Sequence, residues 1–181
     1  MKDLAEKKKK TNIGEYIIYM YQMEDLLRSY KFESNDIKQY VVSHYPVSEE
    51  EKTVIAKWFD ELAHKMKVQG IEEKGHLNEV KSVVDELAHI HWDLLKKDKD
   101  YFKIYGYAKP HVIDFIASAE GQDLGHEIQI CLNGVYGLLL CRLTGRTVTE
   151  KLEEAVTSFG QVLGYLNAVY MDNKKTKLTH G

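Results

Sequence analysis

The sequence predicts an all-α fold, a single-domain helical bundle of six to seven helices with a central buried helix in the C-terminal half. Apolar residues recur with a period of about 3.6 along almost the whole chain, which is typical of amphipathic helices. The chain has only two prolines, Pro46 and Pro110, and both fall where this period breaks. Its one Asn-Gly pair, Asn133-Gly134, lies inside an apolar helical pattern, so the usual β-hairpin signal is missing.

Four helices are predicted in the first half of the chain. The first covers residues 12–30, and a short second one covers residues 35–44. The third covers residues 48–70; it begins with a Ser-x-x-Glu capping box and ends at a glycine, which suits the position after a helix. The fourth covers residues 76–97 and follows a second glycine.

The second half of the chain predicts three further helical regions. Residues 101–119 are interpreted as two pieces divided by Pro110, because proline is favoured in the first turn of a helix. A long apolar helix follows at residues 126–143. The last helix covers residues 147–172 and begins with a Thr-x-x-Glu box.

We expect one domain over residues 1–181, because no low-complexity linker divides the chain. The termini, residues 1–10 and 173–181, are predicted to be flexible ends of that domain. Cys131 and Cys141 lie in an apolar setting without a Cys-x-x-Cys motif. They are therefore interpreted as buried thiols rather than as a disulfide or zinc ligands.

The helix predicted over residues 126–143 differs from the others because it has two apolar faces. Its large face contains Ile128, Leu132, Val135, Tyr136, Leu139 and Leu143, and its small face contains Ile130, Gly134, Gly137 and Cys141. Glycine inside a helix costs about 1 kcal/mol relative to alanine. We therefore expect a neighbouring helix to approach the two glycines closely, and this helix to be central and covered on both sides.

Charge and hydropathy exclude some classes of function. The net charge is −3, whereas general nucleic-acid binding usually needs a basic excess. Lysines cluster only at 7–10 and 174–177, which leaves association with nucleic acid through the termini as a minor alternative. The chain has no apolar segment long enough to cross a bilayer and no apolar stretch typical of a secretory signal. We expect a soluble, cytoplasmic protein without a membrane partner.

The stretch DELAH occurs twice, at 60–64 and 85–89, and each copy contains the Glu-x-x-His spacing of paired-metal bundles. Such ligands must point into the bundle. Helical phasing at about 100° per residue turns the leucine of each copy toward the core and the histidine to the opposite side. We therefore interpret both copies as solvated faces, with Glu61 and Lys65 as an ion pair, and expect no metal site.

Several polar residues do fall on apolar stripes. Glu24 lies on the stripe of the first helix, and Arg28 one turn later is placed to pair with it. His91 and His76 lie on the stripe of the fourth helix. A buried carboxylate needs a partner, so a structural ion pair and a satisfied core histidine are the first interpretations. Together with Tyr21, these residues are nevertheless the candidate lining of a ligand pocket.

Three segments carry a resemblance to a known family. They are NIGEYIIYMYQMEDLLRSYKFE in the first helix, EKGHL at Glu73 to Leu77, and EIQICLNGVYGLLLCRL at Glu127 to Leu143. With these segments the chain resembles a bacterial family of about this length that is catalogued as a domain of unknown function. The resemblance covers nearly the whole chain. It implies an all-helical, single-domain bacterial protein and supplies no catalytic or binding residues.

The sequence contains none of the common nucleotide-binding, hydrolase or zinc-protease motifs. We therefore expect no catalytic residues and no cofactor, and lean away from an enzyme. The first hypothesis is a non-catalytic helical bundle that acts through a protein partner or as a homo-oligomer. The alternatives are a bundle that binds a small ligand or metal in a pocket lined by Glu24, Arg28 and His91, and nucleic-acid association through the lysine-rich termini.

Overall fold

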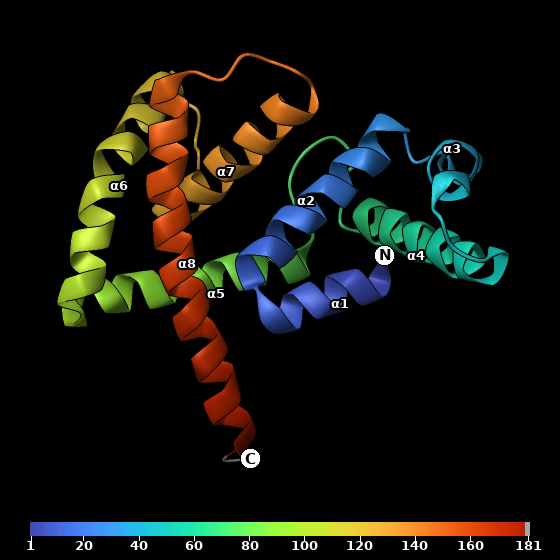
Figure 1. The fold of residues 1–181 in the computed structure, drawn as a ribbon. Coiled ribbons are helices and arrows are strands. Elements are labelled where there is room, and N and C mark those ends of the chain that lie inside the picture. The colour runs from blue at the N-terminus through green and yellow to red at the C-terminus, as the bar shows by residue number, and fades with distance from the viewer. Residues whose placement is uncertain (180–181) are drawn as a thin grey trace. The chain divides into compact units, whose positions relative to one another are not determined.

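The computed structural model describes residues 1–179, and these form eight α-helices and one short 3₁₀ helix, with no strand among them (Figure 1). In chain order they are α1 (Lys2–Thr11), α2 (Ile13–Ser29), α3 (Ser34–Tyr40), η1 (Val42–His44), α4 (Glu49–Val68), α5 (Asn78–Lys97), α6 (Lys99–Ser118), α7 (Glu127–Leu143) and α8 (Glu150–Thr179). The predicted all-α class is confirmed. The helix count is slightly higher than the six to seven expected.

The termini account for part of the difference. Helix α1 occupies the N-terminal segment that the sequence leaves outside its first helix, and α8 continues past the predicted end at Asp172 to Thr179. Flexibility of these ends stays a prediction, and residues 180 and 181 lie outside the described residues.

Helix α6 also departs from the prediction, because it runs unbroken through Pro110 instead of dividing there. A proline inside a helix leaves the carbonyl four residues earlier without its amide partner, which here is the carbonyl of Gly106. Both Pro110 and Gly106 are exposed, so water can hydrate this carbonyl. The exposed position therefore explains how the helix tolerates the proline.

Local signals set several helix ends. The predicted capping box of α4 is present: the Ser48 Oγ accepts the Glu51 amide at 3.2 Å, and the Glu51 carboxylate accepts the Ser48 amide at 3.0 Å. Gly70 follows α4 with a φ of +64°, which favours glycine. The box predicted at Thr147 is wrong. Instead, the Thr149 hydroxyl accepts the Leu152 amide at 3.3 Å, at the start of α8.

The chain divides into two units. Unit 1 contains residues 1–11 and 15–82, and unit 2 contains residues 12–14 and 83 onward. Helix α5 contributes its first turn to unit 1 and the rest to unit 2. The single domain expected from the sequence stays a prediction, and each unit is described by itself below.

Unit 1 is built from α1 to α4, the connection 69–77 and the start of α5. Its core consists of the apolar faces of these helices. Fully buried side chains include Ile17, Tyr21, Leu27, Phe59, Met66, Leu77 and Val80. Helix α3 packs on α4, and η1 packs on both of them.

Unit 2 has α7 and α8 packed against each other, with α6 packed on both. The start of α7 is buried on both sides, with Ile128, Ile130, Cys131 and Leu132 at 0–1% exposure. This confirms the predicted central helix for that part. Its last turn differs, because Leu143 was expected on a buried face and is 65% exposed.

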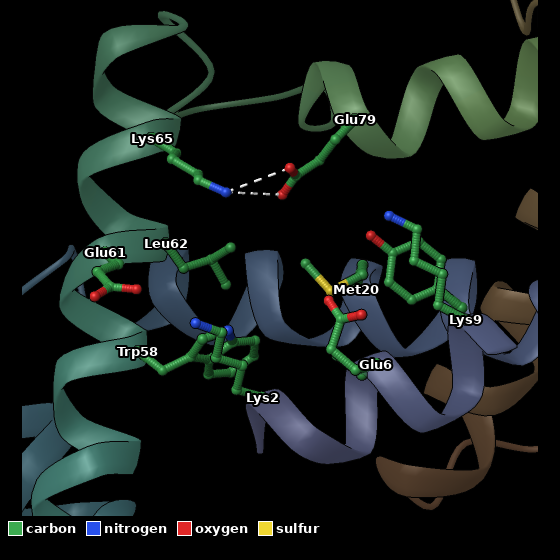
Figure 2. A pocket seen from close by; sticks show the side chains of 11 residues that line it. Lys2, Glu6, Lys9, Met20, Trp58, Glu61, Leu62, Lys65 and Glu79 are labelled. Atoms are coloured by element: carbon green, nitrogen blue, oxygen red, sulfur yellow. Dashed lines mark hydrogen bonds and ion pairs between the residues drawn. The ribbon is translucent and has the colours of Figure 1, made fainter.

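The two DELAH copies have the orientation that phasing predicts. Leu62 and Leu87 are buried, whereas His64 and His89 are exposed. The predicted ion pair between Glu61 and Lys65 is wrong, because Lys65 instead reaches Glu79 at the start of α5, at 3.2 Å (Figure 2). None of the helices described here has the length and apolar character needed to span a membrane.

Candidate functional site

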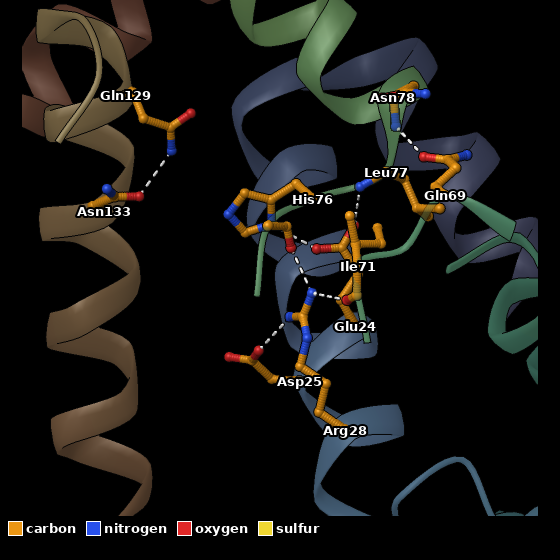
Figure 3. Close-up of polar contacts among 11 residues, drawn as sticks. Glu24, Asp25, Arg28, Gln69, Ile71, His76, Leu77, Asn78, Gln129 and Asn133 are labelled. Atoms are coloured by element: carbon orange, nitrogen blue, oxygen red, sulfur yellow. Dashed lines mark hydrogen bonds and ion pairs between the residues drawn. The ribbon is translucent and has the colours of Figure 1, made fainter. Parts of the chain in front are cut away.

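Three of the candidate residues, Glu24, His76 and Tyr21, meet in unit 1. Figure 3 shows Glu24 and His76. Glu24 projects from α2 and is fully buried. One of its carboxylate oxygens accepts the Leu77 amide at 3.0 Å, and the other contacts the His76 Nδ1 at 2.6 Å. The Tyr21 ring stacks on the His76 ring with centroids 3.6 Å apart. His76 lies before α5 rather than in its first turn, so the stacked ring closes the connection over α2.

Arg28 holds the same connection from one turn further along α2. Its guanidinium donates to the carbonyl oxygens of Ile71, at 3.0 Å, and of Gly75. It also forms an ion pair with Asp25 at 2.8 Å. The pair with Glu24 expected from the sequence is therefore wrong. The i,i+4 spacing allowed a pair between Glu24 and Arg28. Arg28 instead donates to carbonyl oxygens of the 69–77 connection.

These contacts make Glu24 and Arg28 two ends of one clamp. Glu24 satisfies the buried Leu77 amide, which would be costly to leave unpaired, and Arg28 binds two carbonyl groups that are less buried. The chemistry is that of a structural staple. Both carboxylate oxygens of Glu24 already have protein partners, so a structural role explains these contacts without a ligand. Ligand binding by Glu24 and Arg28 stays a prediction.

His76 has one feature of a general base. Glu24 orients its Nδ1 nitrogen, and the side chain keeps 26% exposure. A catalytic histidine of this kind also needs a nucleophile or substrate proton within hydrogen-bond reach of its second nitrogen. Within the described part of the chain, Glu24 is the only hydrogen-bonding partner of His76. The arrangement therefore positions His76 without activating another side chain.

His91, the remaining candidate, has its own surroundings in unit 2. It is fully buried, and its Nδ1 lies 2.6 Å from the Tyr101 hydroxyl. The Tyr105 ring stands edge-on to it with centroids 4.7 Å apart. Burial lowers the pKa of His91 to about 4, so the ring is neutral at pH 7. A pocket shared by His91 and Glu24 stays a prediction.

Tyr101 and Tyr105, which contact His91, and Cys131, which interacts with both tyrosines, are also held in neutral forms. Burial raises the pKa of the Cys131 thiol to about 12, with a further rise from the Glu127 charge. Burial likewise raises the pKa of both Tyr101 and Tyr105. A neutral thiol and neutral phenols are poor nucleophiles and poor bases at pH 7. This buried cluster is therefore better suited to packing than to catalysis.

A groove on unit 1 is the feature that sequence reasoning missed. It has a volume of about 130 Å³ and lies among α1, α2, α4 and α5 (Figure 2). Its floor is apolar and buried, while its rim is charged: Lys2, Glu6 and Lys9 come from α1, and Lys65 and Glu79 from α4 and α5. Residues 2, 6 and 9 share one helix face, which could have indicated a charged rim. This face is not considered when residues 1–10 are predicted to be flexible.

Among the described residues, no three His, Cys, Asp or Glu side chains form a group that could hold a metal ion. Comparison with known proteins instead identifies a family. A family model described as Domain of unknown function (DUF4924) matches residues 2–177. The chain belongs to this family. The match confirms the family resemblance carried by the first helix, and the description of the DUF4924 family assigns no activity.

The DUF4924 family match includes residues of both units. No curated protein and no solved structure matches the chain. Function must therefore be argued from the groups and surfaces described above. A bacterial origin, which the resemblance implies, stays a prediction.

The clamp makes a testable prediction about stability. Glu24→Gln keeps an oxygen for the Leu77 amide but removes the charge that strengthens its two hydrogen bonds. We expect the free energy of unfolding to fall by about 1–2 kcal/mol, measured by urea denaturation at pH 7. Glu15→Gln on the same helix is the matched control. Its pair with Lys8 is exposed, so a change of about 0.5 kcal/mol or less is expected. Equal effects of the two substitutions would contradict the clamp.

Proposed function

We propose that this protein is a non-catalytic helical module that associates with a second copy of itself through the exposed face of α6. One observation carries the proposal. Phe102, Ile113 and Ile116 are all large and apolar, yet they are 61%, 55% and 52% exposed. Single exposed apolar residues are ordinary on a protein surface, whereas several on one helix face are typical of a contact site.

Helical phasing places these side chains on one stripe. Together with Gly106 and Lys109, they recur at alternating intervals of four and three residues, which is the spacing of a coiled-coil seam. The buried face of α6, formed by Tyr101, Tyr105, Ala108 and Val112, lies about 90° around the helix from the stripe. The stripe is therefore an exposed face beside the face that packs in unit 2.

The charges beside the stripe favour a second copy as the partner. Lys103 and Asp114 lie on the same flank of α6, near its two ends. Within the chain each has an exposed partner: Lys103 lies 3.9 Å from Asp100, and Asp114 lies 2.9 Å from Lys151. In an antiparallel pair of α6 helices about a two-fold axis, Phe102 faces Ile113 of the second copy, and Lys103 approaches its Asp114. Lys109 then lies opposite Gly106, where nothing within 4 Å would contact an added Cβ. The face is thus complementary to itself.

The other two hypotheses receive less support. In the N-terminal cluster, Lys8 is paired with Glu15 at 2.7 Å, and Lys9 lies over the Tyr16 ring. In the C-terminal cluster, Lys174 binds Glu86 at 3.0 Å, and the side chain of Lys177 lies outside the described residues. These ion pairs reduce the charge available for nucleic acid. A bacterial, cytoplasmic setting belongs to the same proposal.

Self-association is tested by sedimentation velocity over a range of protein concentrations. A two-helix contact is small for a stable dimer, so we expect a dissociation constant of about 1–100 μM. Ile113→Glu places a charge in the stripe and is expected to leave only monomer. Val68→Glu is the matched control, because Val68 is 72% exposed in unit 1 and lies outside the stripe. A wild-type protein that stays monomeric at several hundred micromolar would refute the proposal.

A charge swap tests the antiparallel arrangement itself. Lys103→Glu alone sets like charges against Asp114 of the second copy and should weaken the dimer about threefold to tenfold. Combining it with Asp114→Lys should restore most of the affinity, because the two charges are exchanged. No recovery in the double variant would mean that another register or another face makes the contact.

A further inference from the structure

The groove on unit 1 supports an inference that is independent of self-association. We infer that it binds a small zwitterion, a molecule with one ammonium or quaternary nitrogen and one carboxylate, such as an α-amino acid or a betaine. No residue of α6 takes part. The argument rests on the charges of the rim, the nature of the floor and the volume between them.

The rim has charges of both signs in equal number. Three lysines and three glutamates line the groove, and Lys65 and Glu79 neutralise each other at 3.2 Å. Lys2 and Glu6 form no ion pair or hydrogen bond among the described residues, and Lys9 contacts only the Tyr16 ring, at 5.2 Å. Lysines and carboxylates that stay unpaired at one opening favour a ligand that carries both charges.

The charged side chains that α1 contributes to the rim form no ion pair with one another. Lys2, Glu6 and Lys9 are one turn apart on α1, a spacing that normally allows ion pairs. Figure 2 shows Glu6 directed toward Met20 on the floor, while Lys2 lies beside Trp58. The two charges are therefore separated along the groove instead of joined. A ligand ammonium at Glu6 and a ligand carboxylate at Lys2 would each complete a pair.

The apolar side chains of the floor would favour binding through contact with apolar parts of the ligand. It consists of Ala5, Tyr16, Met20, Trp58 and Leu62, all buried. These side chains supply the smaller, apolar part of the groove's surface, and the charged rim supplies the larger, polar part. The Trp58 ring can also attract a cationic nitrogen through its face. A small aliphatic side group on the ligand would cover the same surface.

The volume limits the size of the ligand. A groove of 130 Å³ holds about four water molecules at roughly 30 Å³ each. Drug-sized ligands and nucleotides need pockets of about 300 Å³ or more. The groove therefore suits a molecule such as glycine, alanine, valine or glycine betaine.

Tryptophan fluorescence tests this proposal on the full chain. The chain has two tryptophans, and Trp92 is 43% exposed in unit 2. The variant Trp92→Phe leaves Trp58, on the floor of the groove, as the single reporter. This protein is titrated with L-valine and with glycine betaine. Isobutyrate and isobutylamine, which resemble valine but carry one charge each, are titrated as comparison ligands.

We expect a saturable change with L-valine, glycine betaine or both, with a dissociation constant of about 1 mM or lower. Binding of one zwitterion alone identifies whether an amino acid or a betaine is preferred. Isobutyrate and isobutylamine should bind at least tenfold more weakly. The proposal is overturned if neither zwitterion saturates below 100 mM, or if a singly charged ligand binds as tightly.

Substitutions locate the site. Glu6→Gln and Lys2→Met should each weaken binding at least tenfold, because each removes one of the two partners of the zwitterion. Lys10→Met is the matched control; Lys10 is an exposed lysine on the same helix outside the groove, and its loss should leave binding unchanged. All three positions are on the surface, so folding is not at risk. Equal effects of all three substitutions would show general charge attraction instead of a site.

Discussion

Gly134→Ala is expected to lower the free energy of unfolding by about 1–3 kcal/mol, although alanine normally stabilises a helix. A Cβ at Gly134 would lie 2.7 Å from two ring carbons of Phe159 on α8. Phe159 cannot move aside easily, because it is fully buried and its ring packs edge-on against Phe115, with centroids 5.4 Å apart. Urea denaturation measures the loss.

Gly137→Ala is the matched control on the same helix. No atom lies within 4 Å of a Cβ added at Gly137, so only helix propensity should act. We expect this substitution to stabilise the protein by up to about 1 kcal/mol. Equal behaviour of the two variants would show that α8 does not approach α7 closely at Gly134.

A second substitution can confirm the cause. Phe159→Leu removes part of the ring that meets the new methyl group, so Gly134→Ala should cost less in that background. The measured quantity is the coupling free energy of the double-mutant cycle, and about 1 kcal/mol or more is expected. Coupling near zero would mean that strain elsewhere in α7 causes the loss.

Acid should destabilise the protein through His91. Its pKa is about 4 in the folded chain and about 6.5 in the unfolded chain, because burial disfavours the charged ring. Between these two pH values the unfolded chain binds more protons than the folded one, so stability rises with pH there. The contribution is fully present above pH 6.5 and falls by about 3 kcal/mol by pH 4.

His91→Gln isolates this contribution. Glutamine retains a polar atom for the Tyr101 hydroxyl but does not titrate, so the variant should be less stable at pH 7.5 and lose less stability on acidification. The measurement is the free energy of unfolding at pH 7.5, 6.0 and 5.0. His89→Gln on the exposed face is the control and should keep the wild-type slope. If His91→Gln and wild type lose stability in parallel, another group controls the acid response.

The candidate cluster shows how far phasing alone can go. It correctly placed Glu24 and His91 inside, because a residue advances about 100° around any helix. The partner of Glu24 was wrong, since an i,i+4 rule can only choose among residues on the same helix. The actual partners, His76 and the Leu77 amide, are about fifty positions away in sequence and become neighbours only when the 69–77 connection crosses α2.

The glycines of α7 make the same point about packing. Their number indicated close approach of a helix, but not which glycine needed it. Gly134 meets Phe159, and Gly137 meets nothing within 4 Å. That difference depends on the position at which α8 crosses α7. The sequence pattern of α7 alone does not reveal this position.

The sequence by itself determined the all-α class, most helix boundaries, the inward leucines of both DELAH copies and the family. These depend on contacts within a few residues or on direct similarity of sequence. Only the tertiary structure decided the clamp on the 69–77 connection, the groove beside α1 and the outward stripe of α6. Each of these depends on which helix face finds a partner. That choice is made by packing between segments distant in sequence, where many pairings satisfy the same local pattern.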